Sequence, residues 1–209
     1  MRHELHRVRQ KLSADKYLAD VSSISKSLRA FHAKDDCPEV RHEVFKAIVE
    51  LPFKAQFIVA RKIEKVFTKA FARDERRFYD SLLSRLFENT LHQREMNCIY
   101  YAKRGSRKRQ QPLEAAIRSG LDEFERRWKT KISTQFTIQA QTPIGEPCLQ
   151  IIDYMNWAVY RVFTKREMRF YDFVKEKVSL VWDVYDLGKY PSNYYSKKNP
   201  LDIKKISPL

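Results

Sequence analysis

Strand-like and helix-like spacings of apolar residues alternate along this chain, and this alternation constrains the fold more than any other sequence feature. Residues 53–61 (FKAQFIVAR) and 96–102 (MNCIYYA) are short, largely apolar runs that predict strands. Residues 136–140 alternate apolar and polar side chains, as in a strand with one solvated face. A further short strand is predicted at residues 31–34.

Between the strands, apolar residues recur every three or four positions, which predicts helices. Leu5, Val8 and Leu12 are spaced for one face of the first helix. The predicted helices lie at residues 5–12, at 38–51, in a long segment that includes 78–91, at 112–128, at 147–163 and at 168–184. Alternating strands and helices predict an α/β fold, with a mixed sheet flanked by helices.

A length of 209 residues suits one domain. No low-complexity linker divides the chain, so residues 1–188 are predicted to form a single α/β domain. The segment 189–209 is rich in Tyr, Lys, Asn and Pro and is predicted to be an irregular basic tail.

The charge balance favours an anionic partner. Lys and Arg number 41 against 26 acidic residues, for a net charge of +15, and nucleic acid is the simplest such partner. The four glycines are far apart, which excludes glycine-rich phosphate loops. Three scattered cysteines, no signal-like start and no long apolar run predict a cytoplasmic protein without a membrane span.

The first candidate site is the segment FHAKDDCPEVR, which contains His32, Asp35, Asp36 and Glu39. A junction between a strand and a helix start projects side chains toward the strand end, where α/β proteins place ligands. Carboxylate oxygens there suit Mg²⁺ or Mn²⁺. The alternative is helix capping, in which the aspartates accept backbone N–H bonds and Glu39 complements the helix dipole.

The second candidate is the helix segment LQIIDYMNWAVY. Asp153 is the only charged residue between Glu146 and Arg161. Gln150, Asp153 and Trp157 are three and four residues apart, so they share one face. An ionised aspartate among apolar neighbours is costly unless it is paired or bound to a metal. The alternatives are a solvated Asp153 on the outer strip of the helix, or an ion pair with a nearby arginine.

The third candidate is a basic turn at residues 103–109. Arg104, Arg107, Lys108 and Arg109 follow a predicted strand and precede a helix, an arrangement that suits contacts with phosphates. Arg61 and Lys62 at the end of another strand are predicted to join the same face. A solvated loop is the alternative. Arg126, Arg127, Lys129 and Lys131 form a weaker basic patch at a helix end.

Three segments in this order, FHAKDDCPEVR, FKAQFIVARK and LQIIDYMNWAVYR, resemble the domain of unknown function 3800 family. The resemblance implies a ribonuclease H-like fold with metal-binding carboxylates and a nuclease-like role. It assigns Gln150 and Asp153 to the family's acidic helix, and His32 with Asp35, or Asp36, to its central segment. The family's first strands, which carry an Asp-Glu-Ser-Gly segment, have no counterpart here, so the chain is predicted to be truncated at its N-terminus.

Two functional hypotheses follow. In the first, the chain is a metal-dependent nuclease in which Asp153 and Asp35, with Asp36 or Glu39, hold Mg²⁺ or Mn²⁺. His32 would then transfer a proton or contact phosphate, while Lys62 and Arg104 bind the nucleic-acid backbone. In the second, the chain is a non-catalytic nucleic-acid-binding module or an inactive remnant. The sequence does not indicate an oligomeric state.

Overall fold

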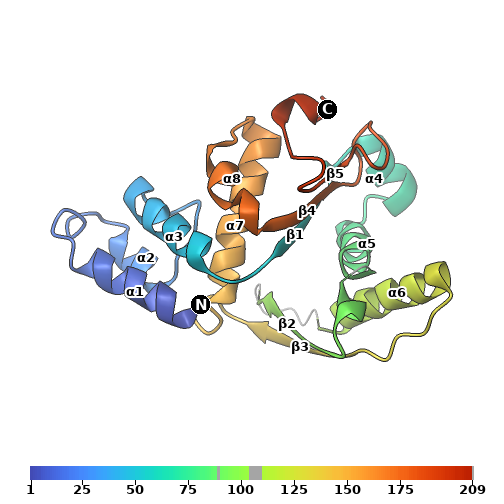
Figure 1. The fold of residues 1–209 in the computed structure, drawn as a ribbon, viewed down its shortest axis with the longest axis horizontal. Coiled ribbons are helices and arrows are strands. Elements are labelled where there is room, and N and C mark those ends of the chain that lie inside the picture. Colours follow the sequence, from blue (N-terminus) through green and yellow to red (C-terminus); the bar gives the residue numbers. More distant parts are fainter. Residues whose placement is uncertain (89, 104–109, 209) are drawn as a thin grey trace. The chain divides into compact units, whose positions relative to one another are not determined.

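The computed structural model describes residues 1–88, 90–103 and 110–208, and it confirms a mixed α/β class (Figure 1). The chain divides into two compact units. Unit 1 comprises Met1–Gln56, Gln141–Leu180 and Tyr195–Ile206. Unit 2 comprises the described residues of Phe57–Ala140, together with Val181–Tyr194 and Ser207–Leu209 up to residue 208.

Unit 1 is built mainly from helices. These are α1 (Arg2–Ser13), α2 (Ile24–Arg29), α3 (Pro38–Glu50), α7 (Cys148–Lys165) and α8 (Arg169–Val174), with short 3-10 helices at Lys175–Lys177 and Ile203–Lys205. Helix α3 packs against α1 and α8, and α8 packs against α7 (Figure 1).

The core of unit 1 follows the apolar stripes of the sequence. Leu5, Val8 and Leu12 are buried on α1, as their spacing predicts. Helix α3 begins at Pro38, where the fixed φ of proline suits the first turn and its missing N–H leaves no bond unmade. Helix α7 buries an apolar stripe that includes Ile151. The apolar stripes of α1, α3 and α7 each cover roughly one face of their helix, and the helices turn these faces toward a shared core.

Unit 2 contains two packed helices beside a pair of strands. Its elements are α4 (Glu64–Phe71), α5 (Glu75–Glu88), a 3-10 helix at Leu91–Gln93, β2 (Met96–Ala102), α6 (Gln110–Trp128) and β3 (Gln135–Gln141), of which Gln141 belongs to unit 1. Strands β2 and β3 pair with each other. Leu91, Leu113 and Ile117 form the buried centre, and partly buried side chains of α5, β2 and β3 pack around it.

Helices α5 and α6 approach each other closely at Gly120. A Cβ atom on this residue would lie 2.5 Å from the backbone oxygen of Ser84, closer than van der Waals contact allows. Only glycine therefore fits this point of the helix pair.

One long helix was predicted where the structure has α4 and α5. The prediction is wrong because Ala72 and Arg73 adopt left-handed backbone conformations, with φ of 49° and 59°, which end α4. The Asp74 carboxylate then accepts hydrogen bonds from the N–H groups of Arg76 and Arg77, at 2.8 and 3.2 Å. This N-cap begins a new helix.

Strands β1 (Ala55–Val59), β4 (Val178–Asp183) and β5 (Tyr194–Tyr195) form a sheet in the order β1-β4-β5. The predicted helix at 168–184 is therefore wrong in its second half, because α8 ends at Val174 and a strand follows. Val178, Val181 and Trp182 are β-branched or aromatic residues, which favour strands. The segment predicted to be irregular contributes β5 to this sheet.

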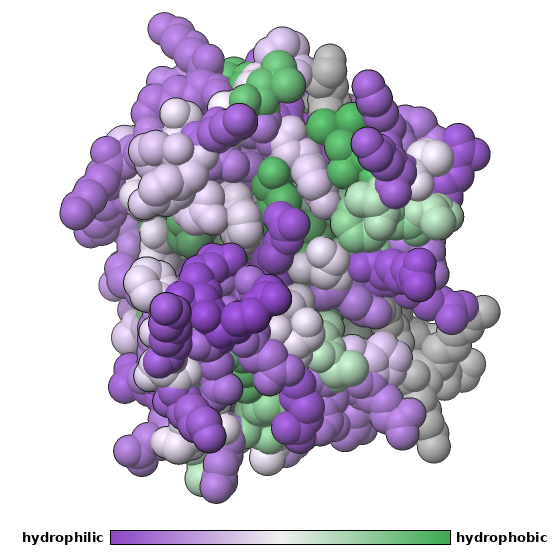
Figure 2. Space-filling model, turned by 90° about the vertical axis from the view of Figure 1, so that its right-hand side faces the viewer, coloured by the Kyte–Doolittle hydropathy of each residue, from purple (hydrophilic) through white to green (hydrophobic). Residues whose placement is uncertain are grey.

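Within the described residues, no helix is both long and apolar enough to cross a membrane. Figure 2 shows one face of the molecule, on which hydrophilic residues predominate and hydrophobic residues lie in small separate patches.

Candidate functional site

Residues 31–37 form a tight turn, so the predicted strand at 31–34 is wrong. The N–H groups of Asp35 and Asp36 both donate to the carbonyl oxygen of His32, at 3.0 and 2.9 Å. The Asp36 carboxylate accepts a hydrogen bond from the backbone N–H of His32 at 2.8 Å. Short polar side chains that bond their own neighbouring backbone compete with strand pairing in this way.

Asp36 lies in the interior of unit 1, with 3% of its surface exposed. Its carboxylate accepts hydrogen bonds from the Ser27 hydroxyl and from the Tyr154 hydroxyl, both at 2.5 Å, in addition to the one from His32 N–H. Burial, followed by the nearby Asp36 charge, raises the pKa of Tyr154, so this phenol stays a donor. Asp36 therefore joins α2, the 31–37 turn and α7.

Gln150 is a second buried polar junction of unit 1. Its side-chain oxygen accepts hydrogen bonds from the guanidinium of Arg9 at 2.7 Å and from the N–H of Phe31 at 3.0 Å. Its amide nitrogen donates to the carbonyl oxygen of Pro143 at 2.5 Å. All of these partners belong to the chain's own framework, so Gln150 acts by holding the turn against α7.

Asp153 lies one turn further along α7 and is half-buried. Its Oδ2 accepts a hydrogen bond from the N–H of Ala33 at 3.0 Å, and its Oδ1 lies 3.8 Å from His32 Nε2. Arg41 donates to the carbonyl oxygen of Ala33 at 3.0 Å and lies over the ring of Trp157, 5.2 Å from its centre. The structure thus brings His32 and Asp153 together at the surface of unit 1.

Asp35 and Glu39 point away from this junction and are exposed. Asp35 pairs with Lys26 at 2.7 Å, and the hydrogen bond and charge of Lys26 lower the pKa of Asp35. Glu39 lies in the first turn of α3, where a backbone N–H and the Cys37 side chain lower its pKa. These contacts agree with the capping interpretation of Glu39.

The donor set does not fit a metal centre. Among residues 1–88, 90–103 and 110–208, no group of three or more His, Cys, Asp or Glu side chains is placed to hold a metal ion. Asp36 is closed off by three donors of its own chain, and Asp35 is held by Lys26. The Mg²⁺ or Mn²⁺ site stays a prediction that the described geometry does not favour.

The basic candidates divide into two groups. Lys62 pairs with Glu75 at 2.8 Å, lies 4.1 Å from the ring centre of Phe67 and stays about half exposed. Four further predicted contacts with nucleic acid lie outside the described residues: Arg104, Arg107, Lys108 and Arg109.

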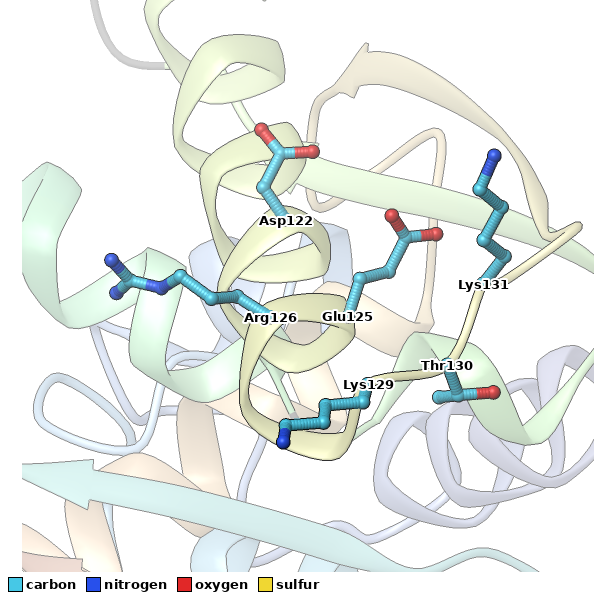
Figure 3. A pocket seen from close by; sticks show the side chains of 6 residues that line it. All are labelled: Asp122, Glu125, Arg126, Lys129, Thr130 and Lys131. Atoms are coloured by element: carbon cyan, nitrogen blue, oxygen red, sulfur yellow. The ribbon is translucent and has the colours of Figure 1, made fainter.

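Three residues of the weaker basic patch, Arg126, Lys129 and Lys131, line a hollow of ≈ 450 Å³ at the C-terminal end of α6. Figure 3 shows its lining side chains: Asp122, Glu125, Arg126, Lys129, Thr130 and Lys131. Glu125 accepts a hydrogen bond from the N–H of Ile132 at 2.7 Å, and Arg126 pairs with Glu123. Because acidic side chains share this hollow with the cations, it is a weak anion site.

Arg61 was predicted to join the basic face, but its side chain is buried in an ionic cluster of unit 2 that sequence reasoning missed. The Arg61 guanidinium lies 3.0 Å from the Asp183 carboxylate and 2.8 Å from that of Asp186, and it donates to the carbonyl oxygen of Ser207 at 2.5 Å. Burial raises the pKa of Asp183 to about 6, although the Arg61 charge opposes this shift. The sequence did contain a signal for this cluster, because Asp183 and Asp186 follow an apolar run. The signal was not used because a helix was predicted over these residues.

Comparison of the chain with known protein families, with curated proteins and with solved structures finds no match.

Proposed function

We propose that this chain binds nucleic acid through electrostatic contacts and does not cleave it. The observation that carries the proposal is the net charge of +15, with basic residues in excess over acidic ones in both units. Neutralising backbone phosphates releases condensed counterions, which is the main source of affinity in sequence-independent binding.

The environment of the carboxylates supports binding over catalysis. Two-metal phosphoryl chemistry needs several carboxylates with free oxygens around ions that lie about 3.5–4 Å apart. Asp36 is buried with three donors, and one oxygen of Asp153 is occupied by Ala33 N–H. These side chains fix the 31–37 turn, so they are poorly placed to hold metal ions.

The ribonuclease H-like fold is part of the same proposal. Two segments that carry the resemblance, FHAKDDCPEVR and LQIIDYMNWAVYR, lie side by side through the contacts of Phe31 with Gln150 and of Ala33 with Asp153. An experimental structure tests the assignment. The described residues form separate sheets, β1-β4-β5 and β2-β3, which counts against the assignment, whereas a single mixed sheet containing β1, β2 and β3 in an experimental structure would support it.

Binding is tested by fluorescence anisotropy with labelled single-stranded and duplex oligonucleotides, at salt concentrations between about 50 and 200 mM. We expect log K to fall linearly with log salt, with a slope of about −0.7 per phosphate contact for single strands and about −0.9 for duplex. Affinity that is absent, or that does not change with salt, overturns the proposal.

A charge variant with a matched control locates the contact. Replacing Arg104, Arg107, Lys108 and Arg109 by Gln should weaken binding at least about tenfold. The control removes the same number of charges from unit 1, at Arg7, Lys11, Lys16 and Lys46, and should weaken binding less. Asp153→Asn should leave binding unchanged. If the chain cleaves nucleic acid in the presence of Mg²⁺ and Asp153→Asn abolishes the cleavage, the proposal of binding without cleavage is overturned in favour of catalysis.

A further inference from the structure

Unit 2 contains a groove of ≈ 760 Å³ whose lining includes Arg127 of the weaker basic patch. Helices α5 and α6 form two of its sides, and Trp182 of β4 and Tyr194 of β5 form another. Its lining also includes the cations Arg77 and Arg85, the carboxylate Asp80, and the hydroxyls of Ser84 and Ser119. Its volume lies within the roughly 300–1,000 Å³ of ligand pockets, so it suits one or two nucleotides rather than a duplex.

The aromatic side of the groove is a stacking surface. The rings of Trp182 and Tyr194 lie with centres 4.9 Å apart and planes 30° from parallel. Both side chains are half-buried, so each presents part of its ring to solvent. Asp183 N–H donates to the carbonyl oxygen of Asn193 at 3.0 Å, and the Asn193 amide donates to that of Asp183 at 2.9 Å. These bonds lie next to both rings in sequence and hold them in place.

The cations of the groove differ in how far they are neutralised. Arg127 lies 2.7 Å from the buried carboxylate of Glu88 and 3.6 Å from that of Glu123, so its charge is balanced. Arg85 lies over the Trp182 ring, 5.7 Å from its centre. Within the described part of the chain, Arg77 and Arg85 form no ion pair with a carboxylate. Two cations beside an aromatic pair can therefore bind phosphates.

We infer that this groove binds single-stranded nucleic acid, with a base stacked on the Trp182–Tyr194 pair and the adjoining phosphates on Arg77 and Arg85. The inference rests on the proposed nucleic-acid function and names its substrate class. Every base has a π face, so stacking on aromatic side chains does not depend on sequence. The bases of a duplex are already stacked and cannot reach such a groove. The hydroxyls of Ser84 and Ser119 can bond phosphate or sugar oxygens.

The stacking contact is tested with Trp182 as the only tryptophan, in a protein that carries Trp128→Phe and Trp157→Phe. Its fluorescence should be quenched when an oligothymidylate binds and should stay unchanged with a duplex of the same length. Quenching in proportion to bound single strand supports the inference, and binding without quenching overturns it.

Substitutions provide a second test. Trp182→Ala should weaken single-strand binding about 5- to 150-fold, the range measured for loss of one stacked base, and Trp182→Phe should recover most of the loss. Tyr17→Ala, which removes an exposed tyrosine in unit 1, is the matched control and should have no effect. Arg77→Gln and Arg85→Gln should each reduce the salt slope by about 0.7.

The two proposals fail in different ways. Salt-dependent binding that Trp182→Ala leaves intact would overturn the groove as the binding site while nucleic-acid binding stands. No binding to single strand or duplex would overturn both. Tighter binding to duplex than to single strand would also overturn the groove, since a duplex cannot stack its bases there.

Discussion

Two buried aspartates, one in each unit, show how differently this chain surrounds a carboxylate. Asp36 in unit 1 is 3% exposed and accepts hydrogen bonds from two hydroxyls and one backbone N–H. Asp183 in unit 2 is fully buried, and among the described residues the cation that pairs with it is Arg61, at 3.0 Å. Within the described chain, neither Asp183 oxygen accepts a well-aligned hydrogen bond.

The difference separates a structural junction from an ionic cluster. Neutral donors from α2, the 31–37 turn and α7 solvate Asp36, so its carboxylate holds three segments together. Asp183 depends on one cation that it shares with Asp186, and burial raises its pKa to about 6. Buried ion pairs contribute little net stability but become strongly destabilising when one partner is removed. Each aspartate therefore predicts a different response to substitution and to pH.

The largest effect is expected from Arg61→Met. This change leaves two buried carboxylates, Asp183 and Asp186, without a cation, and should lower the free energy of unfolding by about 3–5 kcal/mol. Urea denaturation followed by circular dichroism measures it. Lys62→Met is the matched control, because the neighbouring Lys62 pairs with Glu75 and contacts the Phe67 ring at the surface, and its loss should change stability by no more than about 1 kcal/mol. Equal effects at both positions would refute the ionic cluster.

Asp36→Ala should be the next largest. It leaves the hydroxyls of Ser27 and Tyr154 and the N–H of His32 without their acceptor. Buried donors without partners are costly, and we expect a loss of about 3 kcal/mol, or a melting temperature lower by roughly 6–12 °C. Asp35→Ala is the control, since Asp35 is exposed and its ion pair is with Lys26 at the surface. A large effect of Asp35→Ala would contradict this assignment of roles.

Much of the fold could be predicted from periodicity. The stripes of α1, α3 and α6, and the strands β2 and β3, follow from apolar spacing alone, because each element buries a single face. Residues 31–37 could not be predicted in this way. Their turn depends on Asp36 reaching Tyr154 of α7, more than a hundred residues away, and local sequence carries no such information.

The candidate site was predicted in part. His32 and Asp153 were singled out, and the structure brings them together at 3.8 Å. The roles of Asp36 and Gln150 were not predictable, because a carboxylate or an amide can bind a ligand or its own chain equally well in sequence. The groove was missed because Trp182 was placed on a helix and Tyr194 in an irregular tail.

The pH dependence of stability distinguishes Asp183 from the other carboxylates. Its pKa is about 6 in the folded chain and near its ordinary value, about 4, in the unfolded chain. Between these values only the folded chain binds the proton. The contribution of Asp183 is therefore fully present below about pH 4 and is lost as the pH rises through 6, by about 2–3 kcal/mol.

The measurement compares the wild type with Asp183→Asn, which cannot titrate at this position. The stability of wild type relative to the variant should decrease from pH 4 to pH 7. The surface carboxylates titrate in both proteins, so their effect cancels in this difference. Those whose pKa is lowered, such as Asp35 and Glu75, act in the opposite direction, losing stability as the pH falls. A constant difference across this range would show that Asp183 does not titrate there.

The smallest expected effect tests whether the three donors of Asp36 act together. Tyr154→Phe removes one hydroxyl from a fully buried ring and keeps the packing, so it should reduce stability by about 1.5 kcal/mol, the lower end of the range for a hydrogen bond to a charged group. Ser27→Ala should cost about the same. In the double variant Asp36 keeps only His32 N–H, and the remaining bond must solvate a buried charge alone. The combined loss should therefore exceed the sum of the single losses, which a double-mutant cycle measures. Simple additivity would indicate that water replaces the missing hydroxyls. Asp36 and Asp183 would then differ only in how many hydrogen-bond donors surround the carboxylate.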